Sequence, residues 1–423
     1  MRGPWPIPDD ADPRLADVGP GILQARKVAR RLEQLVLEMG EGISERLYRG
    51  AQNMASRGEY RFITAEADSA RVFDELMRQG APAAASRPAL PDLGLPSDPR
   101  RLRAAWENMS AADRDELFHL DPFIGNRDGI PQADRDMYNR TTLNNLRDVP
   151  LTRQNYRRQD AYSDIAEMLD ARQPGQPRIY LSYLDAEGRL AFSVDNPDLA
   201  DNAVVLLKPA DGGNSLNYGV PTALHLRQVA LLAAPGARTS VTFWGNYDQP
   251  GSMVHAIFAN PAREGADRVR DFHEGLRATH EGAPAHTTTI GHSYASVLAG
   301  HAAGHGVPLN TDNVLFIGSW GTGVNHAGEL SLTGVAPDRT AENIFATMAD
   351  SDQVRAMPGT HGPLPTDPDF DATVIGSRSQ LPGVLNEADH GSQAYLDPAN
   401  PASGNIGLIM TGHGDLVSRP DRS

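Results

Sequence analysis

The chain has 423 residues, of which 40% are hydrophobic, a formal net charge of -15 and an isoelectric point of about 5.3. A chain of this length can form one large core or two domains. The acidic balance argues against a nucleic-acid partner, because affinity for a phosphate backbone comes largely from clustered Lys and Arg side chains.

Cysteine is absent, which excludes disulfides, a thiolate nucleophile and cysteine-ligated metal centres. No stretch approaches the roughly 18 apolar residues of a transmembrane helix, and the amino terminus lacks the apolar core of a signal peptide. We therefore expect no transmembrane segment and a cytoplasmic location by default. Leaderless export and incorporation in a larger assembly stay open as alternatives.

Residues 1–80 are predicted to form an N-terminal helical region, because apolar residues recur at three- and four-residue steps. Residues 81–100 are rich in Pro and Ala and indicate a linker. Residues 101–176 are predicted to form a charged helical lead-in to an α/β domain that spans 177–423. The N-terminal helices are candidates for contacting a protein partner, and a helix packed on the core is the plainer interpretation.

After residue 177 the pattern changes to short runs that favour strands. IYLSYLD and RLAFSVDN predict a hairpin, and six further runs alternate with helical stretches: VVLLKP, SVTFWG, TTTIGH, VLFIGS, IFATMA and DATVIG. Strands that alternate with helices imply parallel βαβ units. The fold class is therefore α/β, with an eight-stranded, mostly parallel sheet of the α/β-hydrolase fold.

The motif TTTIGHSYAS places Ser293 between the fifth predicted strand and a helix. A serine hydroxyl becomes a nucleophile when a base takes its proton, and the nucleophile elbow presents it on a sharp strand-to-helix turn. Small residues two before and two after relieve the crowding there, and Gly291 and Ala295 occupy those positions. We expect Ser293 to be the nucleophile.

The acid and base should follow the seventh and eighth strands, in that order. Asp350 and Asp352 both follow IFATMA, and Asp352 is preferred because it lies farther into the loop. His390 comes after DATVIG and is preferred as the base to His361, which precedes that strand.

Two backbone amides should stabilise the oxyanion. One belongs to Tyr294, the residue after the expected nucleophile. The other should come from KPADGGNS after the third strand, from Ala210 or Asp211.

Two other motifs suggest different chemistry on weaker grounds. His301 and His305 stand four apart on a helix, as metal ligands can, but no third ligand is placed beside them. GSWGTGVNHAG resembles a dinucleotide loop, yet His326 stands where the third Gly belongs. We therefore expect no metal and no cofactor.

The sequence resembles an uncharacterised actinobacterial α/β-hydrolase family with a GHSYG-like elbow and a helical GNxDGxP lead-in. The lead-in pattern is matched by Trp106, Arg114, Leu117, Asn126, Asp128, Gly129, Pro131, Arg135, Asp136, Asn139 and Arg140. The resemblance implies the hydrolase fold, a serine nucleophile, and Asp352 and His390 at the family's acid and base positions. KPADGGNS departs from the family's PGTG-like loop.

We therefore expect a serine hydrolase that cleaves a carboxylic ester, with a small-molecule or lipid ester as substrate. A catalytically silent scaffold that docks through its N-terminal helices is the alternative, and the departure in KPADGGNS favours it. The long segment 353–389 should wall or cover the substrate pocket, because it joins strands at the edge that carries the nucleophile.

Overall fold

The computed structural model describes residues 93–419, apart from 153–154, 171–174, 211–214, 252–254 and 358. The predicted helical region 1–80 and most of the predicted linker lie outside these residues. The chain divides into two compact units, and the larger one spans 84–251 and 259–423. All elements discussed below belong to that larger unit.

Within the described residues, four helices precede the sheet: α4 (Pro99–Glu107), α5 (Ala111–Leu120), α6 (Gln132–Arg147) and α7 (Tyr156–Asp170). Local side chains fix where the first two begin. Asp98 caps α4 by accepting a hydrogen bond from the amide of Arg101 at 2.8 Å, and Ser110 and Asp113 form a reciprocal capping box at α5. Helices thus make up most of the described residues between 99 and 170.

The eight predicted strands are all present: β1 (Ile179–Leu184), β2 (Leu190–Val194), β3 (Asn202–Leu207), β4 (Thr239–Trp244), β5 (His286–His292), β6 (Asn313–Ile317), β7 (Ile344–Thr347) and β8 (Thr373–Val374). They form one sheet in the order β1-β2-β4-β3-β5-β6-β7-β8, in which only the pairings of β2 are antiparallel. The predicted α/β-hydrolase fold, with its eight-stranded and mostly parallel sheet, is confirmed.

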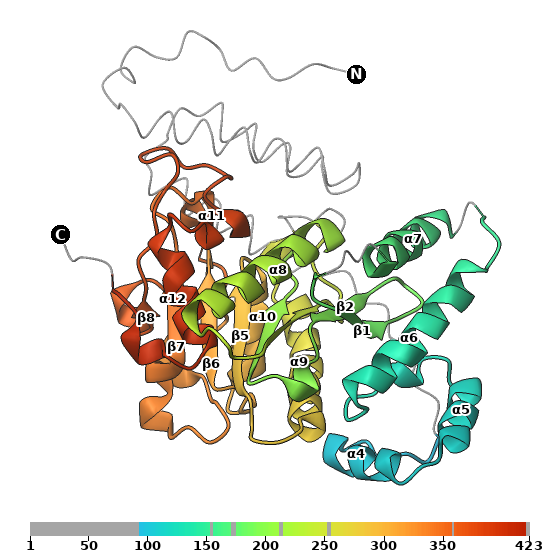
Figure 1. Cartoon of the computed structure of the whole chain (residues 1–423). Helices are drawn as coiled ribbons and strands as arrows, with labels where there is room; N and C mark the ends of the chain where they lie inside the picture. Colours follow the sequence, from blue (N-terminus) through green and yellow to red (C-terminus); the bar gives the residue numbers. More distant parts are fainter. Residues whose placement is uncertain are drawn as a thin grey trace, which may run out of the picture. The chain divides into compact units, whose positions relative to one another are not determined.

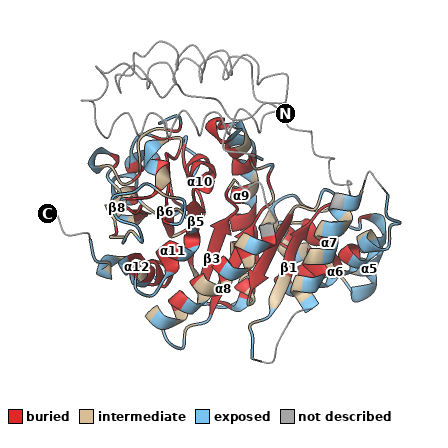
Figure 2. Cartoon of the chain, turned by 90° about the horizontal axis from the view of Figure 1, so that it is seen from above, coloured by how far each residue is buried: buried red, intermediate tan, exposed pale blue. Residues whose placement is uncertain are grey.

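The described part of the chain holds five further helices after β3: α8 (Ser215–Ala233), α9 (Asn260–Thr279), α10 (Ala295–Ala303), α11 (Ser392–Leu396) and α12 (Pro401–Met410). Helices α8 and α12 pack together on one face of the sheet, and α9 and α10 pack together on the other (Figures 1 and 2). The central strands are buried on both faces, and β3 and β6 are accordingly apolar over most of their length. Across the described part of the chain, no helix has the length and apolarity to cross a membrane.

The helical lead-in covers the free edge of the sheet, at β1. Asn126 donates to the carbonyl of Leu184 at 2.6 Å and accepts from the amide of the same residue at 2.9 Å. Arg135 donates to the carbonyl of Ser182 at 2.9 Å, and Asp136 accepts from the amide of Leu181 at 2.7 Å. An edge strand exposes unpaired backbone groups, and these side chains satisfy them. The GNxDGxP lead-in therefore has a structural role at β1.

Candidate active site

Ser293 lies at the sharp turn between β5 and α10, as the motif predicts. Its φ of 55° is in the left-handed region, which costs a residue with a side chain on the order of 1–3 kcal/mol. The surroundings hold this conformation: the amide of Ser293 donates to the carbonyl of Ile317 on β6 at 3.0 Å. The turn is thus fixed to the neighbouring strand.

The small residues around the serine have a steric reason. A Cβ on Gly291 would lie 2.7 Å from the Cα of Ser296 and 2.8 Å from the carbonyl oxygen of Ala295. Ser296 also donates its hydroxyl to the carbonyl of Gly291 at 2.9 Å, which ties the first turn of α10 to the end of β5. A side chain at position 291 would push the helix away and open the elbow.

Three side chains from separate loops form one chain of hydrogen bonds. The Oγ of Ser293 lies 3.0 Å from Nε2 of His390. The Nδ1 of His390 lies 3.1 Å from Oδ2 and 3.0 Å from Oδ1 of Asp352. A carboxylate only accepts, so Nδ1 of the neutral ring carries the proton and Nε2 is left to accept the serine proton. The structure thus brings together the three residues predicted as nucleophile, base and acid.

The neighbouring candidates lie elsewhere. The side chain of Asp350 is 94% exposed, and it contacts Arg355 at 3.3 Å. Asp352 has no exposed surface. It lies two residues farther along the loop than Asp350, and its carboxylate there contacts the ring of His390. His361 is buried against the loop after β6, where its carbonyl accepts from the amides of Thr322 and Gly323 at 3.0 and 2.8 Å.

The buried carboxylate of Asp352 is held in its charged form. Burial by itself raises the pKa of Asp352, but the hydrogen bond and charge of His390 oppose this. The Tyr395 hydroxyl and the Val354 amide also donate to the carboxylate, and the balance lowers its pKa below the ordinary value. At neutral pH the carboxylate can therefore accept from His390.

His292, directly before the serine, connects the elbow to the base. Its Nε2 donates to the carbonyl of His390 at 2.8 Å, and its Nδ1 accepts from the hydroxyl of Tyr218 on α8 at 3.1 Å. The rings of His292 and His390 lie 5.0 Å apart, and burial, followed by the nearby ring of His390, lowers the pKa of His292 to about 3. A neutral His292 does not repel positive charge on its neighbour.

Gly318, just after β6, leaves room for the contact between acid and base. Its φ is 53°, and a Cβ there would lie 3.0 Å from Oδ2 of Asp352 and 3.1 Å from Nδ1 of His390. Gly318 and His292 were not predicted as site residues from the sequence. The available signals were a glycine directly after the predicted strand VLFI and a histidine beside the serine.

The predicted oxyanion donors are placed in part. Tyr294 starts the turn into α10 with φ of -58° and ψ of -27°, directly after Ser293. Ala210 lies three residues beyond Leu207, which pairs with Gly291 in the parallel ladder between β3 and β5. Because β3 and β5 are parallel, the segments that hold Tyr294 and Ala210 both follow the carboxyl ends of their strands, where Ser293 also lies. Asp211 lies outside the described residues.

The two histidines predicted on one helix are separated by its end: His301 lies on α10, whereas His305 follows the last helical residue, Ala303, and has a φ of 59°. Nδ1 of His301 lies 2.8 Å from Nε2 of His305, and the two rings stack with centroids 4.8 Å apart. Within the residues that the structure covers, no three His, Asp or Glu side chains are arranged to hold a metal ion.

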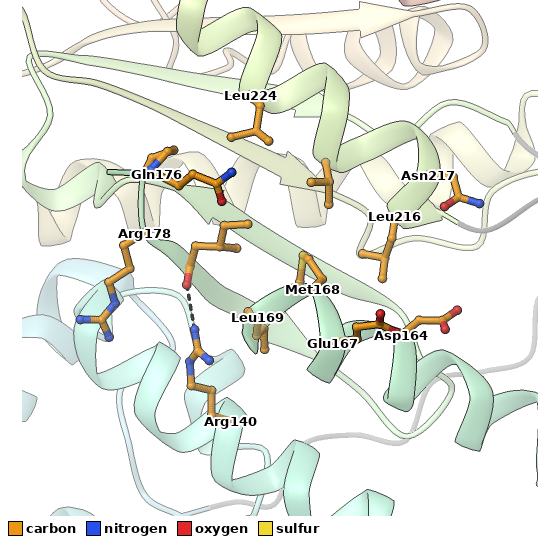
Figure 3. Close-up of a pocket in the computed structure, with 13 residues that line it drawn as sticks. Arg140, Asp164, Glu167, Met168, Leu169, Gln176, Arg178, Leu216, Asn217 and Leu224 are labelled. Atoms are coloured by element: carbon orange, nitrogen blue, oxygen red, sulfur yellow. Dashed lines mark hydrogen bonds between the residues drawn. The ribbon is translucent and has the colours of Figure 1, made fainter. Parts of the chain in front are cut away.

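A cavity of about 760 Å³ lies between α7, α8 and the start of β1 (Figure 3). Arg140 and Arg178 line it, but both guanidinium groups are paired with Asp136. Three strands separate β1 from β5, so this cavity is distinct from the hydrogen-bonded group at Ser293. We assign it no ligand.

Comparison with known proteins places part of the chain in context. Residues 185–361 match the family described as Alpha/beta hydrolase, a range that contains Ser293 and Asp352 and ends before His390. The chain is 25% identical over 367 residues to an uncharacterized protein of Mycobacterium tuberculosis, a match that covers 74% of this chain and 55% of the relative. It is 35% identical over 89 residues to an uncharacterized protein of Mycobacterium bovis, covering 21% of this chain and 33% of that one. The chain thus spans about half the length of the first of these relatives.

Two solved esterase structures show distant similarity. A mutant of the esterase E40 is 14% identical, with a TM-score of 0.34 over 67% of this chain and 92% of that one. The esterase LipW from Mycobacterium marinum is 13% identical, with a TM-score of 0.32 over 67% of this chain and 90% of that one. Similarity at this level carries no argument about activity. Over residues 185–361 the chain is similar to an α/β-hydrolase family, in agreement with the resemblance seen in its sequence.

Proposed function

We propose that this protein is a serine hydrolase that cleaves carboxylic esters through an acyl-enzyme on Ser293. The observation that carries the proposal is the continuous hydrogen-bonded chain from Ser293 through His390 to Asp352, at 3.0 and 3.1 Å. Those distances are within the range in which a base can take a proton from a nucleophile. The left-handed turn at Ser293 supports the same assignment, because nucleophile elbows are strained in this way.

In this mechanism the serine oxygen attacks the ester carbonyl carbon while Nε2 of His390 takes the serine proton. Asp352 accepts from Nδ1 and stabilises the imidazolium, and it takes up no proton itself. The backbone amides of Tyr294 and Ala210 are the proposed donors to the oxyanion. His390 then gives its proton to the departing alkoxide. In the second half-reaction water attacks the acyl-enzyme while Nε2 of His390 takes a proton from the water, and His390 returns that proton to the oxygen of Ser293 as the carboxylic acid leaves.

A small-molecule or lipid ester fits this chemistry, and the mechanism requires no cofactor. The test pairs a fluorophosphonate probe with hydrolysis of a short-chain aryl ester. Wild type should be labelled and should turn over the ester, and Ser293→Ala should do neither. Ser240→Ala is the matched control, because it removes a buried serine hydroxyl on β4 that donates to the carbonyl of Asp195 at 2.9 Å, and this variant should still be labelled.

Variants of the acid and base refine the assignment. His390→Gln should lower kcat by about 10⁴-fold or more, and Asp352→Ala by less, as triad acids often do. Asp350→Ala, two residues from the proposed acid and exposed, should leave kcat unchanged. A well-folded wild type without labelling or turnover would instead favour the silent scaffold that docks through its N-terminal helices.

A further inference from the structure

Tyr395 contacts the proposed acid from the same segment that supplies the base. It lies on α11, five residues after His390, and its ring and hydroxyl are fully buried. The hydroxyl oxygen lies 2.6 Å from Oδ2 of Asp352, the oxygen that also lies 3.1 Å from Nδ1 of His390. One short stretch of chain therefore holds the carboxylate at two points.

The direction of this hydrogen bond follows from its partners. The amide of Ala349 donates to the hydroxyl oxygen of Tyr395 at 3.2 Å, so the oxygen already acts as an acceptor there. A carboxylate accepts only, and the hydroxyl proton must therefore point to Asp352. Burial, together with the negative charge of Asp352, raises the pKa of Tyr395 well above its ordinary value, so the hydroxyl keeps its proton.

Asp352 needs this donor because it has no contact with solvent. A buried carboxylate is costly unless its oxygens are hydrogen-bonded. Three donors surround it: the amide of Val354 on Oδ1 at 2.9 Å, the hydroxyl of Tyr395 on Oδ2, and the ring of His390 across both. Two of the three are independent of the reaction, and they hold the carboxylate in one orientation while His390 gains and loses its proton.

We propose that Tyr395 is a positioning residue, whose hydroxyl keeps Asp352 ionised and aimed at Nδ1 of His390 throughout the catalytic cycle. The inference rests on the proposed hydrolase function of Ser293. In each half-reaction one proton moves from the attacking oxygen to Nε2 of His390 and then to the leaving oxygen. Asp352 takes up no proton in these steps and Tyr395 keeps its own, because Tyr395 stabilises the charged form of the carboxylate.

The test is Tyr395→Phe, which removes one oxygen atom and keeps the ring. Loss of a hydrogen bond to a charged group should lower kcat by about tenfold or more, with KM for a short-chain aryl ester nearly unchanged. Removing a donor to the charged form raises the pKa of Asp352, so the acidic limb of the kcat/KM profile should move to higher pH. Tyr138→Phe is the matched control, because Tyr138 is also buried and donates to a carboxylate, that of Asp115, at 3.1 Å in the lead-in. It should leave kcat and the pH profile as in wild type.

A purely structural role for Tyr395 would lower the unfolding temperature without moving the pH profile. A folded Tyr395→Phe protein with wild-type kcat and an unmoved acidic limb overturns the inference while the proposed function stands.

A second readout does not depend on turnover. The proton between Nδ1 of His390 and the carboxylate should give a downfield ¹H resonance that is absent in Asp352→Asn. The pH at which this resonance changes should rise in Tyr395→Phe and not in Tyr138→Phe. If wild type shows no Ser293-dependent labelling, the proposed function fails. Independently of that result, a pH midpoint of this resonance that is the same in Tyr395→Phe as in wild type would refute the inferred role of Tyr395 at Asp352.

Discussion

Replacement of His292 tests whether the elbow histidine is neutral in the folded protein. The folded pKa of about 3 lies far below the 6.5 of an ordinary histidine, because the ring is buried and lies beside His390. In the unfolded chain the ring takes up a proton near pH 6.5, whereas in the folded chain it resists protonation down to about pH 3. The contribution of His292 to stability is therefore complete above pH 6.5 and is lost progressively as the pH falls toward 3.

The size of the effect follows from linkage. The slope approaches about 1.4 kcal/mol per pH unit below pH 6.5, so wild type should lose about 2 kcal/mol of unfolding free energy at this residue between pH 6.5 and pH 4.5. His292→Gln has no proton to bind, and its amide can still donate to the carbonyl of His390. Its unfolding free energy should fall less steeply over that interval, whatever its stability at neutral pH.

The assay is urea unfolding followed by tryptophan fluorescence at several pH values between 7.5 and 4.5. Tyr218→Phe serves as the matched control: it removes the donor to Nδ1 of His292 at 3.1 Å and keeps the titrating ring. The Tyr218→Phe protein should have a lower unfolding free energy than wild type at every pH, and that free energy should fall with decreasing pH as steeply as in wild type. Parallel curves for wild type and His292→Gln would refute a neutral buried ring at this position.

Three further substitutions probe the surroundings of the site. Gly318→Ala should lower kcat at least tenfold, because the new Cβ would lie 3.1 Å from Nδ1 of His390. Gly236→Ala controls for backbone strain, because Gly236 has a φ of 92° and a Cβ there would have no atom within 4 Å; this variant should keep wild-type kcat. Asn126→Ala should cost about 2–4 kcal/mol of unfolding free energy in urea denaturation, because it leaves two backbone groups of β1 without their partner, and a loss below about 1 kcal/mol would contradict the role assigned to the lead-in. Leu381→Ser, at a side chain 54% exposed in the segment that leads to His390, should raise KM severalfold for long-chain aryl esters and leave short-chain KM unchanged; equal KM across acyl lengths would show that this segment contributes nothing to the pocket.

The strands and the order of the site residues could be predicted from the sequence because both depend on local patterns. Short β-rich runs between helical stretches gave all eight strands, and Ser293 stood out by the small residues on either side. The acid and base followed from their positions after the seventh and eighth strands. Asp352 was favoured over Asp350 from its position in the loop, and the structure explains the difference by burial, since one side chain is wholly enclosed and the other is 94% exposed.

The contacts that support these residues could not be predicted, because they join segments far apart in the chain. Tyr395 donates to a carboxylate 43 residues earlier, and Tyr218 to a histidine 74 residues later. Periodicity and turn signals carry no information about such pairs, since they depend on how α8 and α11 pack over the sheet. The lead-in residues were recognised by resemblance, but only the placement of Asn126, Arg135 and Asp136 beside β1 gives them a physical role.

The most direct test of the account is to locate the acyl group during turnover. Wild type would be mixed with an aryl ester, quenched in acid within milliseconds, digested and examined by peptide mass spectrometry. The account predicts a burst of aryl alcohol with one acyl group per chain on Ser293, and no such adduct in Ser293→Ala. Aryl ester turnover that persists in Ser293→Ala, or an acyl group on another residue of wild type, would contradict it.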